Sequence, residues 1–109
     1  KDIVRGVSNA PSTRTLTIDD IKQEVSGYYN QEISLLSAKT RKHEVVLARQ
    51  MCMFLAKQLT QMSLKSIGMH FGGRDHTTVL HSCQTIMNYI DTDKKSRADV
   101  EFLRKALQR

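Results

Sequence analysis

Apolar residues recur at the three- and four-residue spacing of helices from residue 16 onward, and no segment shows the strict alternation that indicates a strand. The longest stripe follows the pattern i, i+1, i+4, i+7, i+8, i+11 and consists of Val79, Leu80, Cys83, Ile86, Met87 and Ile90. Side chains at this spacing form one continuous helix face, which we expect to pack inward. The chain is therefore predicted to be all-α.

The first helix is predicted to begin at Thr17. The Thr17 hydroxyl can cap the free N–H groups of the first turn, and Asp20 stands in the reciprocal position of a capping box. Leu16 and Ile21 have the spacing of a hydrophobic staple, which fixes the direction in which the chain enters the helix. Gly27 weakens the far end of the same helix.

A short 3₁₀ segment is predicted at residues 33–36, followed by a long helix from about residue 42 or 43 to about residue 61. The long helix is apolar around most of its circumference, which is typical of a central, buried helix. Its polar side carries Arg49, Gln50 and Lys57. The simplest interpretation is that the charged groups of this side only reach past the apolar surface to water.

A helix-turn-helix is predicted next. Ser63 can cap a short helix, and Gly72 stands where a left-handed residue would end it. The following helix begins at Asp75 or His76 and continues to about Ile90. Two helices joined by a short turn that contains glycine form a helix-turn-helix. The predicted fold is thus a compact helical bundle of about five to six helices, with a helix-turn-helix similar to that of the Trp repressor.

The two ends of the chain have different predicted structures. Residues 1–15 are polar and rich in turn formers, so we predict a linker or the remnant of an upstream element. The pair Ser96-x-x-Asp99 predicts the cap of a last helix, whose inward residues are Val100, Leu103 and Leu107. At 109 residues, the chain is expected to hold a single folded domain over residues 16–109.

Charge narrows the range of partners. The formal net charge is +6 and the pI about 9.6, which favours a polyanion, either nucleic acid or an anionic membrane surface. The basic residues gather in the middle of the chain, where only Glu44 opposes them before Asp75: Lys39, Arg41, Lys42, Arg49, Lys57, Lys65 and Arg74.

The cysteines and the N-terminus narrow the class of protein further. Cys52 and Cys83 fall on apolar helix faces and are interpreted as core residues of a reduced, cytoplasmic protein. Two cysteines without a Cys-x-x-Cys pair do not supply a structural zinc site. The stretch that begins at Lys1 has no apolar run of the kind found in a signal peptide, so nothing marks the chain for export.

The exposed side of the predicted helix 75–90 is polar but almost uncharged. A helix face that only meets water is usually filled with Glu and Lys, whereas this one carries Thr77, His81, Gln84, Thr85 and Asn88. Such groups match the hydrogen-bonding groups on base edges, and the N-terminal residues of a recognition helix are the ones that reach them. We therefore expect this helix to read DNA in the major groove.

Individual roles follow from side-chain chemistry. Asp75 can accept a hydrogen bond from a cytosine amino group, and His76 can donate one to a purine. Thr77 can hydrogen-bond to a base edge or place its methyl group against a thymine methyl. Leu80 can also contact a thymine methyl. The first-turn N–H groups, with the Thr78 hydroxyl, suit a phosphate. Further phosphate contacts are expected from Arg49, Gln50, Lys57, Lys65 and Arg74.

Simpler interpretations remain for the same residues. Asp75 and Thr78 can cap the helix without any ligand, and His76 and His81 can be ordinary surface histidines. Five positions separate these histidines, so they do not form a helical metal pair.

The segment Phe71-Gly72-Gly73-Arg74-Asp75-His76-Thr77-Thr78-Val79-Leu80-His81 closely resembles the signature of the C-terminal DNA-binding domain of the DnaA family, the bacterial chromosomal replication initiators. The likeness extends to Leu16-Thr17-Ile18-Asp19-Asp20-Ile21, Ser37-Ala38-Lys39-Thr40-Arg41 and Ala48-Arg49-Gln50-Met51, and covers about residues 16–109.

The resemblance implies a set of DNA contacts. The residue that matches Arg41, in a basic loop at 39–43, enters the minor groove and senses A·T-rich sequence. Residues that match Asp75, His76, Thr77 and Leu80 contact bases. Residues that match Arg49, Gln50, Lys57, Thr78 and His81 contact the DNA backbone. The full set of expected phosphate contacts adds the basic residues Lys39, Lys65 and Arg74. The family's target is a short asymmetric box repeated in the replication origin.

The resemblance also has limits. Lys65, Thr85 and His43 depart from residues that are frequent in the family, which affects single phosphate contacts more than base preference. Full-length members bind ATP in an ATPase domain, but no Gly-x-x-x-x-Gly-Lys-Ser/Thr loop occurs here. We expect a fragment cut after that domain, with no cofactor of its own and no enzymatic activity.

Other functions remain open from the residues alone. The chain can be a helical protein-interaction module in a replication-regulatory assembly, and regulatory proteins can share the DNA-binding surface. Binding to an anionic membrane through Ile3, Val4 and Val7, with Lys1 and Arg5, is disfavoured because that helix is short. An enzyme is disfavoured because no nucleophile elbow accompanies the Ser, His and Asp residues. The isolated chain is expected to be a nucleoid-associated monomer without an apolar surface stripe.

Overall fold

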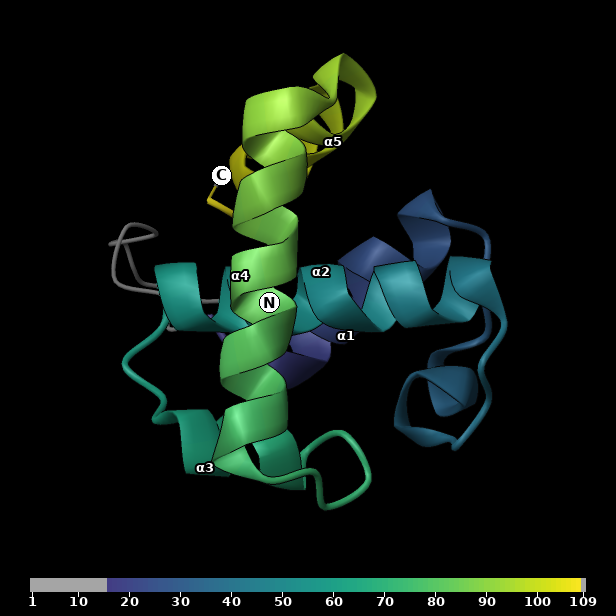
Figure 1. Cartoon of the computed structure of the whole chain (residues 1–109), viewed down its shortest axis with the longest axis vertical. Coiled ribbons are helices and arrows are strands. Elements are labelled where there is room, and N and C mark those ends of the chain that lie inside the picture. Colours follow the sequence, from purple (N-terminus) through teal and green to yellow (C-terminus); the bar gives the residue numbers. More distant parts are fainter. Residues whose placement is uncertain (1–15, 109) are drawn as a thin grey trace, which may run out of the picture.

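The central element of the fold is α2 (His43–Leu59), which crosses the middle of the molecule in Figure 1. The computed structural model describes residues 16–108. Over that range it contains no strand, which confirms the predicted all-α class. The predicted linker at residues 1–15, with the apolar group Ile3, Val4 and Val7, lies outside the described residues.

The remaining elements surround α2. In Figure 1, α4 lies across α2 in front, α1 runs behind it, and α3 lies beside the N-terminal end of α4. In chain order, the elements around α2 are α1 (Ile18–Tyr28), η2 (Ile33–Ser37), α3 (Leu64–Met69), α4 (His76–Thr92) and α5 (Lys94–Leu107).

Burial explains why α2 is central. Its side chains from residue 51 to 56 are buried on every side of the helix, as expected for a helix without a continuous polar face. Cys52 on α2 and Cys83 on α4 are both free and buried, so their interpretation as core residues is confirmed. α2 ends at Leu59, two residues before the predicted end, because the backbone of Thr60 is extended.

Two predicted caps are present. The Thr17 hydroxyl accepts from the backbone N–H of Asp20 at 3.2 Å, and the Asp20 carboxylate accepts from the N–H of Thr17 at 3.0 Å. The Ser63 hydroxyl accepts from the N–H of Ser66 at 3.1 Å and caps α3. Each side-chain cap stabilises its helix by about 1 kcal/mol. The short 3₁₀ segment is also confirmed as η2.

The predicted cap of the last helix is wrong. α5 begins at Lys94, and its N-cap is Asp93, which accepts from the N–H of Lys95 at 3.3 Å and from the Ser96 hydroxyl at 2.8 Å. α4 ends at Thr92, so Asp93 alone joins the two helices and its carboxylate is the one available to the first turn. Ser96 and Asp99 both lie inside α5 and are buried.

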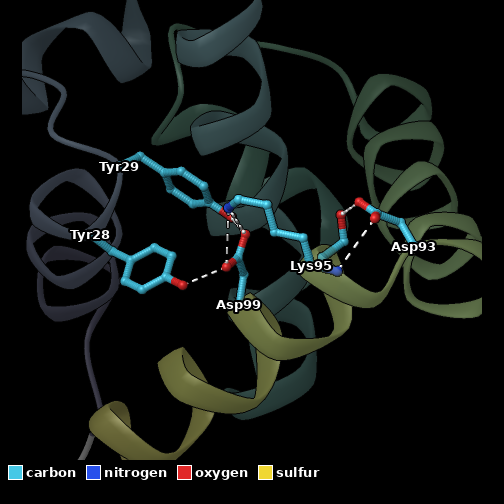
Figure 2. A network of polar contacts seen from close by, with 6 residues as sticks. Tyr28, Tyr29, Asp93, Lys95 and Asp99 are labelled. Atoms are coloured by element: carbon cyan, nitrogen blue, oxygen red, sulfur yellow. Dashed lines mark hydrogen bonds and ion pairs between the residues drawn. The ribbon is translucent and has the colours of Figure 1, made fainter.

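Asp99 instead joins α5 to the end of α1, as Figure 2 shows. Its carboxylate accepts from the Tyr28 hydroxyl, from the Tyr29 hydroxyl at 3.1 Å and from Lys95 Nζ at 3.2 Å. The hydrogen bond to Asp99 raises the pKa of Tyr28 to about 12, and burial raises the pKa of Tyr29 above its ordinary value. The ring of Tyr28 also stacks on Phe102, with ring centroids 5.1 Å apart.

Part of the predicted apolar stripe on α4 does not pack inward. Val79, Cys83 and Ile86 are buried, but the exposed fraction is 44% for Leu80 and 52% for Met87. These two stand at the rim of the stripe and extend beyond the contact with α2. Leu80 and Met87 are thus two apolar side chains on the surface of α4. The expectation that no apolar stripe remains on the surface, and the monomeric state that rests on it, stay predictions.

Candidate nucleic-acid interface

The turn between α3 and α4 depends on a close approach at Gly68. The backbone N–H of Arg74 donates to the Gly68 carbonyl at 3.0 Å, which brings the two chain segments together. A Cβ atom at Gly68 would lie 2.0 Å from the Arg74 carbonyl oxygen and 3.3 Å from a methyl of Val79. Only glycine fits at this crossing, so Gly68 sets the position of α4 relative to α3.

Gly72 and Gly73 complete the same turn. Both have positive φ angles, 81° and 74°, which is the left-handed conformation expected for Gly72. Gly72 does not itself cap α3, however, because α3 ends at Met69 and its C-cap is His70. The chain makes a further turn before α4 starts, and a Cβ atom at Gly72 would meet the Ser37 carbonyl oxygen at 2.6 Å.

Asp75 caps α4 and remains ionised. Its carboxylate accepts from the N–H of Thr78 at 2.8 Å, which confirms the predicted start of the helix at His76. This backbone hydrogen bond is the main reason why the pKa of Asp75 is held below its ordinary value. A negative charge at this point also suits the positive end of the helix dipole.

The first turns of α4 face solvent. The side chains of Asp75, His76, Thr77, Thr78 and His81 are exposed, together with the half-exposed Leu80. Between residues 76 and 90 the helix contains no Asp, Glu, Lys or Arg. In Figure 1 this end of α4 projects at the bottom of the molecule, beside α3. The structure therefore presents an exposed polar helix end that carries no formal charge beyond its cap.

A second exposed segment, residues 38–42, lies between η2 and α2. Lys39, Arg41 and Lys42 are exposed there, and the N–H of Lys42 donates to the Thr40 hydroxyl at 3.2 Å. None of these basic side chains forms an ion pair with a described residue. The segment thus adds unneutralised positive charge on the same part of the molecule as the α3–α4 turn, to which it is hydrogen-bonded.

Two arginines make that connection. Arg49 donates to the Ala38 carbonyl at 3.1 Å, and Arg74 donates to the same oxygen at 2.9 Å and also to the Phe71 carbonyl. Arg49 is only 8% exposed, so it does not reach freely into water as its simplest interpretation required. Burial, and secondarily the positive charge of Arg74, lowers the pKa of Arg49. A shared acceptor between two cations is a place where added negative charge is stabilised.

The remaining predicted residues are more dispersed. Lys65 is exposed on α3, Gln50 is half-buried in the middle of α2, and Lys57 is exposed near its end. Thr85 is half-buried, and its hydroxyl donates to the His81 carbonyl at 3.0 Å. The structure therefore brings together the start of α4 and the segment 38–42, with Lys57 further along α2.

Sequence reasoning missed Lys22. Its ammonium group donates to the His70 carbonyl at 2.5 Å and lies 4.7 Å from the ring centroid of Phe71, in a cation–π contact. Lys22 thus ties α1 to the α3–α4 turn across 48 positions of sequence. The available signal was its place as the only basic residue on an otherwise acidic helix.

The comparisons with known proteins agree with this geometry. The family model described as the helix-turn-helix of the bacterial DnaA protein matches residues 18–86, which include α2, α3, the turn and most of α4. The chain belongs to the bacterial DnaA helix-turn-helix family. The resemblance of the segment 71–81 to the family signature is therefore confirmed.

Relatives named chromosomal replication initiator protein DnaA cover most of the chain. That of Flavobacterium psychrophilum is 46% identical over 86% of the chain and 20% of its own length. Those of Chlorobaculum tepidum and Bacteroides thetaiotaomicron are 40% and 41% identical over 99% and 98% of the chain, and over 21% and 23% of their own lengths. The chain thus spans about a fifth of the length of the curated relatives it matches.

The described residues contain neither a candidate membrane span nor a candidate metal site. None of the helices in residues 16–108 combines the length and the apolar composition needed to cross a membrane. No group of His, Cys, Asp and Glu side chains in this range is arranged to hold a metal ion.

Proposed function

We propose that this domain binds double-stranded DNA sequence-specifically, at short A·T-rich boxes of a replication origin. The observation that carries the proposal is the exposed, polar and uncharged start of α4, with the exposed cationic side chains of Lys39, Arg41 and Lys42 beside it. A helix of this kind fits the major groove, and adjacent cations attract the phosphates on both sides of it.

The base contacts proposed in the major groove come from the start of α4. Asp75 uses one carboxylate oxygen for its cap, and its low pKa keeps the group ionised, so it can accept from a cytosine amino group. His76 and Thr77 follow on the same exposed turn. The 44% exposure of Leu80 leaves its methyl groups available to a thymine methyl.

The contact proposed in the minor groove comes from Arg41. Its side chain is exposed on the segment that follows η2, and it forms no ion pair within the described residues. Arginine favours the narrow minor groove of A·T-rich DNA, where the negative potential is strongest. A domain that reads both grooves at once requires an asymmetric box with an A·T-rich side.

Phosphate contacts are proposed for a wider set. Arg49 already donates to a carbonyl group, but a guanidinium has five N–H donors and can hold a phosphate with those that remain. The N-terminal N–H groups of α4 suit a phosphate as well. The proposed set is Lys39, Arg49, Gln50, Lys57, Lys65, Thr78 and His81. Arg74, which the sequence also suggested as a phosphate contact, donates from both terminal nitrogens to backbone carbonyls and is not retained in this set.

The biological role follows from the relatives. They are named chromosomal replication initiator proteins, so we propose that this domain contributes to initiation by attaching such a protein to its origin in the nucleoid. Regulatory proteins that contact the start of α4 would compete with DNA for it.

The deciding test is a mobility-shift assay with purified chain. A box is first selected from a pool of duplexes with a randomised centre and is then compared with its scrambled version at increasing salt. We expect binding to the box to be roughly a thousandfold tighter than to the scrambled duplex. A chain that selects no sequence and binds both duplexes equally overturns the proposal.

Substitutions locate the base contacts. Thr77→Ala is expected to cost about 1–3 kcal/mol on the box and to leave binding to the scrambled duplex unchanged. The matched control is Thr92→Ala, an exposed threonine at the other end of α4. Equal losses on both duplexes would exclude Thr77 as a base contact.

A further inference from the structure

Side-chain hydrogen bonds join the α3–α4 turn to the segment that carries Arg41. The bond between the residues most distant in sequence is made by Arg74. Its guanidinium donates to the Phe71 carbonyl at the start of the turn and, across 36 positions of sequence, to the Ala38 carbonyl at 2.9 Å. One planar group therefore holds two backbone carbonyls, one from each segment.

Two neighbouring contacts press the same segments together. The Ser37 hydroxyl donates to the His70 carbonyl at 3.2 Å. The backbone of Gly72 lies so close to Ser37 that a Cβ atom would come within 2.6 Å of the Ser37 carbonyl oxygen. The two segments are thus in close contact, and the carbonyl groups that Arg74 bridges have little freedom to move apart.

We infer that Arg74 is a positioning residue that sets the distance between the two DNA-reading elements. It fixes residues 38–42, and with them Arg41, against the turn from which α4 begins. The inference rests on the proposed function, in which Arg41 reads the minor groove while the start of α4 reads the major groove. The spacing between these two elements must match the spacing between the two grooves. A bridge that fixes the spacing therefore determines which boxes offer favourable contacts in both grooves at once.

A positioning role differs in its consequences from a phosphate contact. Loss of a phosphate contact weakens binding to all duplexes and reduces the dependence of log K on log salt by about 0.9. Loss of the bridge leaves that slope unchanged and lowers only the preference for the box. Lysine supplies a point charge but no planar fork, so Arg74→Lys separates the two roles.

The experiment compares Arg74→Ala and Arg74→Lys with Arg104→Ala, which removes the same charge on α5. Within residues 16–108, the Arg104 side chain forms its only ion pair with Glu101, at 3.4 Å. Thermal melting first confirms that each variant is folded. Backbone ¹⁵N order parameters of residues 38–42 are then measured without DNA. We expect them to fall below about 0.6 in both Arg74 variants and to stay at the wild-type value in the control.

Binding to the selected box and to its scrambled version follows. We expect both Arg74 variants to bind the box about tenfold more weakly, with less than a threefold change on the scrambled duplex. In the Arg41→Ala background, Arg74→Ala should cost less than about threefold on the box, because the element that it positions is gone.

The outcomes separate the possible failures. Unchanged order parameters in Arg74→Ala overturn the bridge, whatever the domain binds. Equal losses on both duplexes with a reduced salt slope, and rescue by lysine, make Arg74 a phosphate contact and overturn the positioning role. If Arg74→Ala weakens binding to the box as much in the Arg41→Ala background as in the wild type, the positioning role is also overturned. A wild-type chain that does not distinguish the duplexes overturns the proposed function, and with it the role of Arg74 in box preference.

Discussion

Gly68→Ala tests the crossing on which the helix-turn-helix depends. The new Cβ would lie 2.0 Å from the Arg74 carbonyl oxygen and 3.0 Å from its carbon, and both are backbone atoms that cannot rotate away. An ordinary contact between non-bonded heavy atoms is about 3.5–4.0 Å, so the new Cβ and the carbonyl oxygen must move apart by about 1.5 Å or more. The fully buried Val79, whose methyl is 3.3 Å away, opposes that shift.

The magnitude follows from two opposing effects. Forcing extra volume into a packed site costs about 1–3 kcal/mol and more where backbone must move. The change from glycine to alanine inside a helix returns about 1 kcal/mol. We therefore expect a net destabilisation of about 2 kcal/mol. In a domain of this size, that lowers Tm by roughly 10 °C.

The assay is thermal unfolding followed by circular dichroism, with two matched glycines as controls. Gly27→Ala places its Cβ in open space within α1. Because alanine has the higher helix propensity, by about 1 kcal/mol, this variant should raise Tm by a few degrees at most. Gly73→Ala has a positive φ but no close neighbour, so it measures backbone strain alone, about 1–2 kcal/mol. If Gly68→Ala melts at or above the wild-type temperature, the steric reasoning is wrong.

Other predictions concern titration, the Asp99 network and a phosphate contact. Because its folded pKa is raised from 10.0 to about 12, Tyr28 contributes stability that is present below pH 10 and is lost as pH rises through 12. The stability of Tyr28→Phe should lack this loss between pH 10 and 12, and identical alkaline unfolding profiles of the two proteins would contradict the prediction. The folded pKa of Asp75 lies below 3.8, so its contribution is present above that pH and is lost as pH falls further; Asp75→Asn should remove the loss from acid-unfolding curves. Asp99→Ala leaves the hydroxyls of Tyr28 and Tyr29 without their acceptor and should lower the free energy of unfolding in urea by about 2–4 kcal/mol. A decrease below about 1 kcal/mol would refute this prediction. Lys65→Ala should weaken binding to box and scrambled duplexes alike and reduce the salt slope by about 0.9, whereas a loss confined to the box would assign Lys65 to base reading.

Local signals predicted most of the helical elements. The capping residues Thr17, Ser63 and Asp75 all lie within a few positions of the N–H groups that they bind, so their roles are visible in the residue order. The same reasoning failed at Ser96 and Asp99, because their spacing is also compatible with positions inside a helix. Asp93 sits at the junction itself, while Asp99 is drawn to tyrosines some 70 positions away.

Residue order alone was enough to predict most of the helices, their order, the glycine turn, the exposed polar start of α4 and membership of the family. These depend on interactions between residues three or four positions apart, or on a contiguous signature. Tertiary structure alone decided that Ala38 meets Arg49 and Arg74, that Lys22 meets the turn, and that Asp99 joins α5 to α1. Each of these contacts connects segments distant in the chain, and their pairing depends on how the helices pack around α2, which no local pattern specifies.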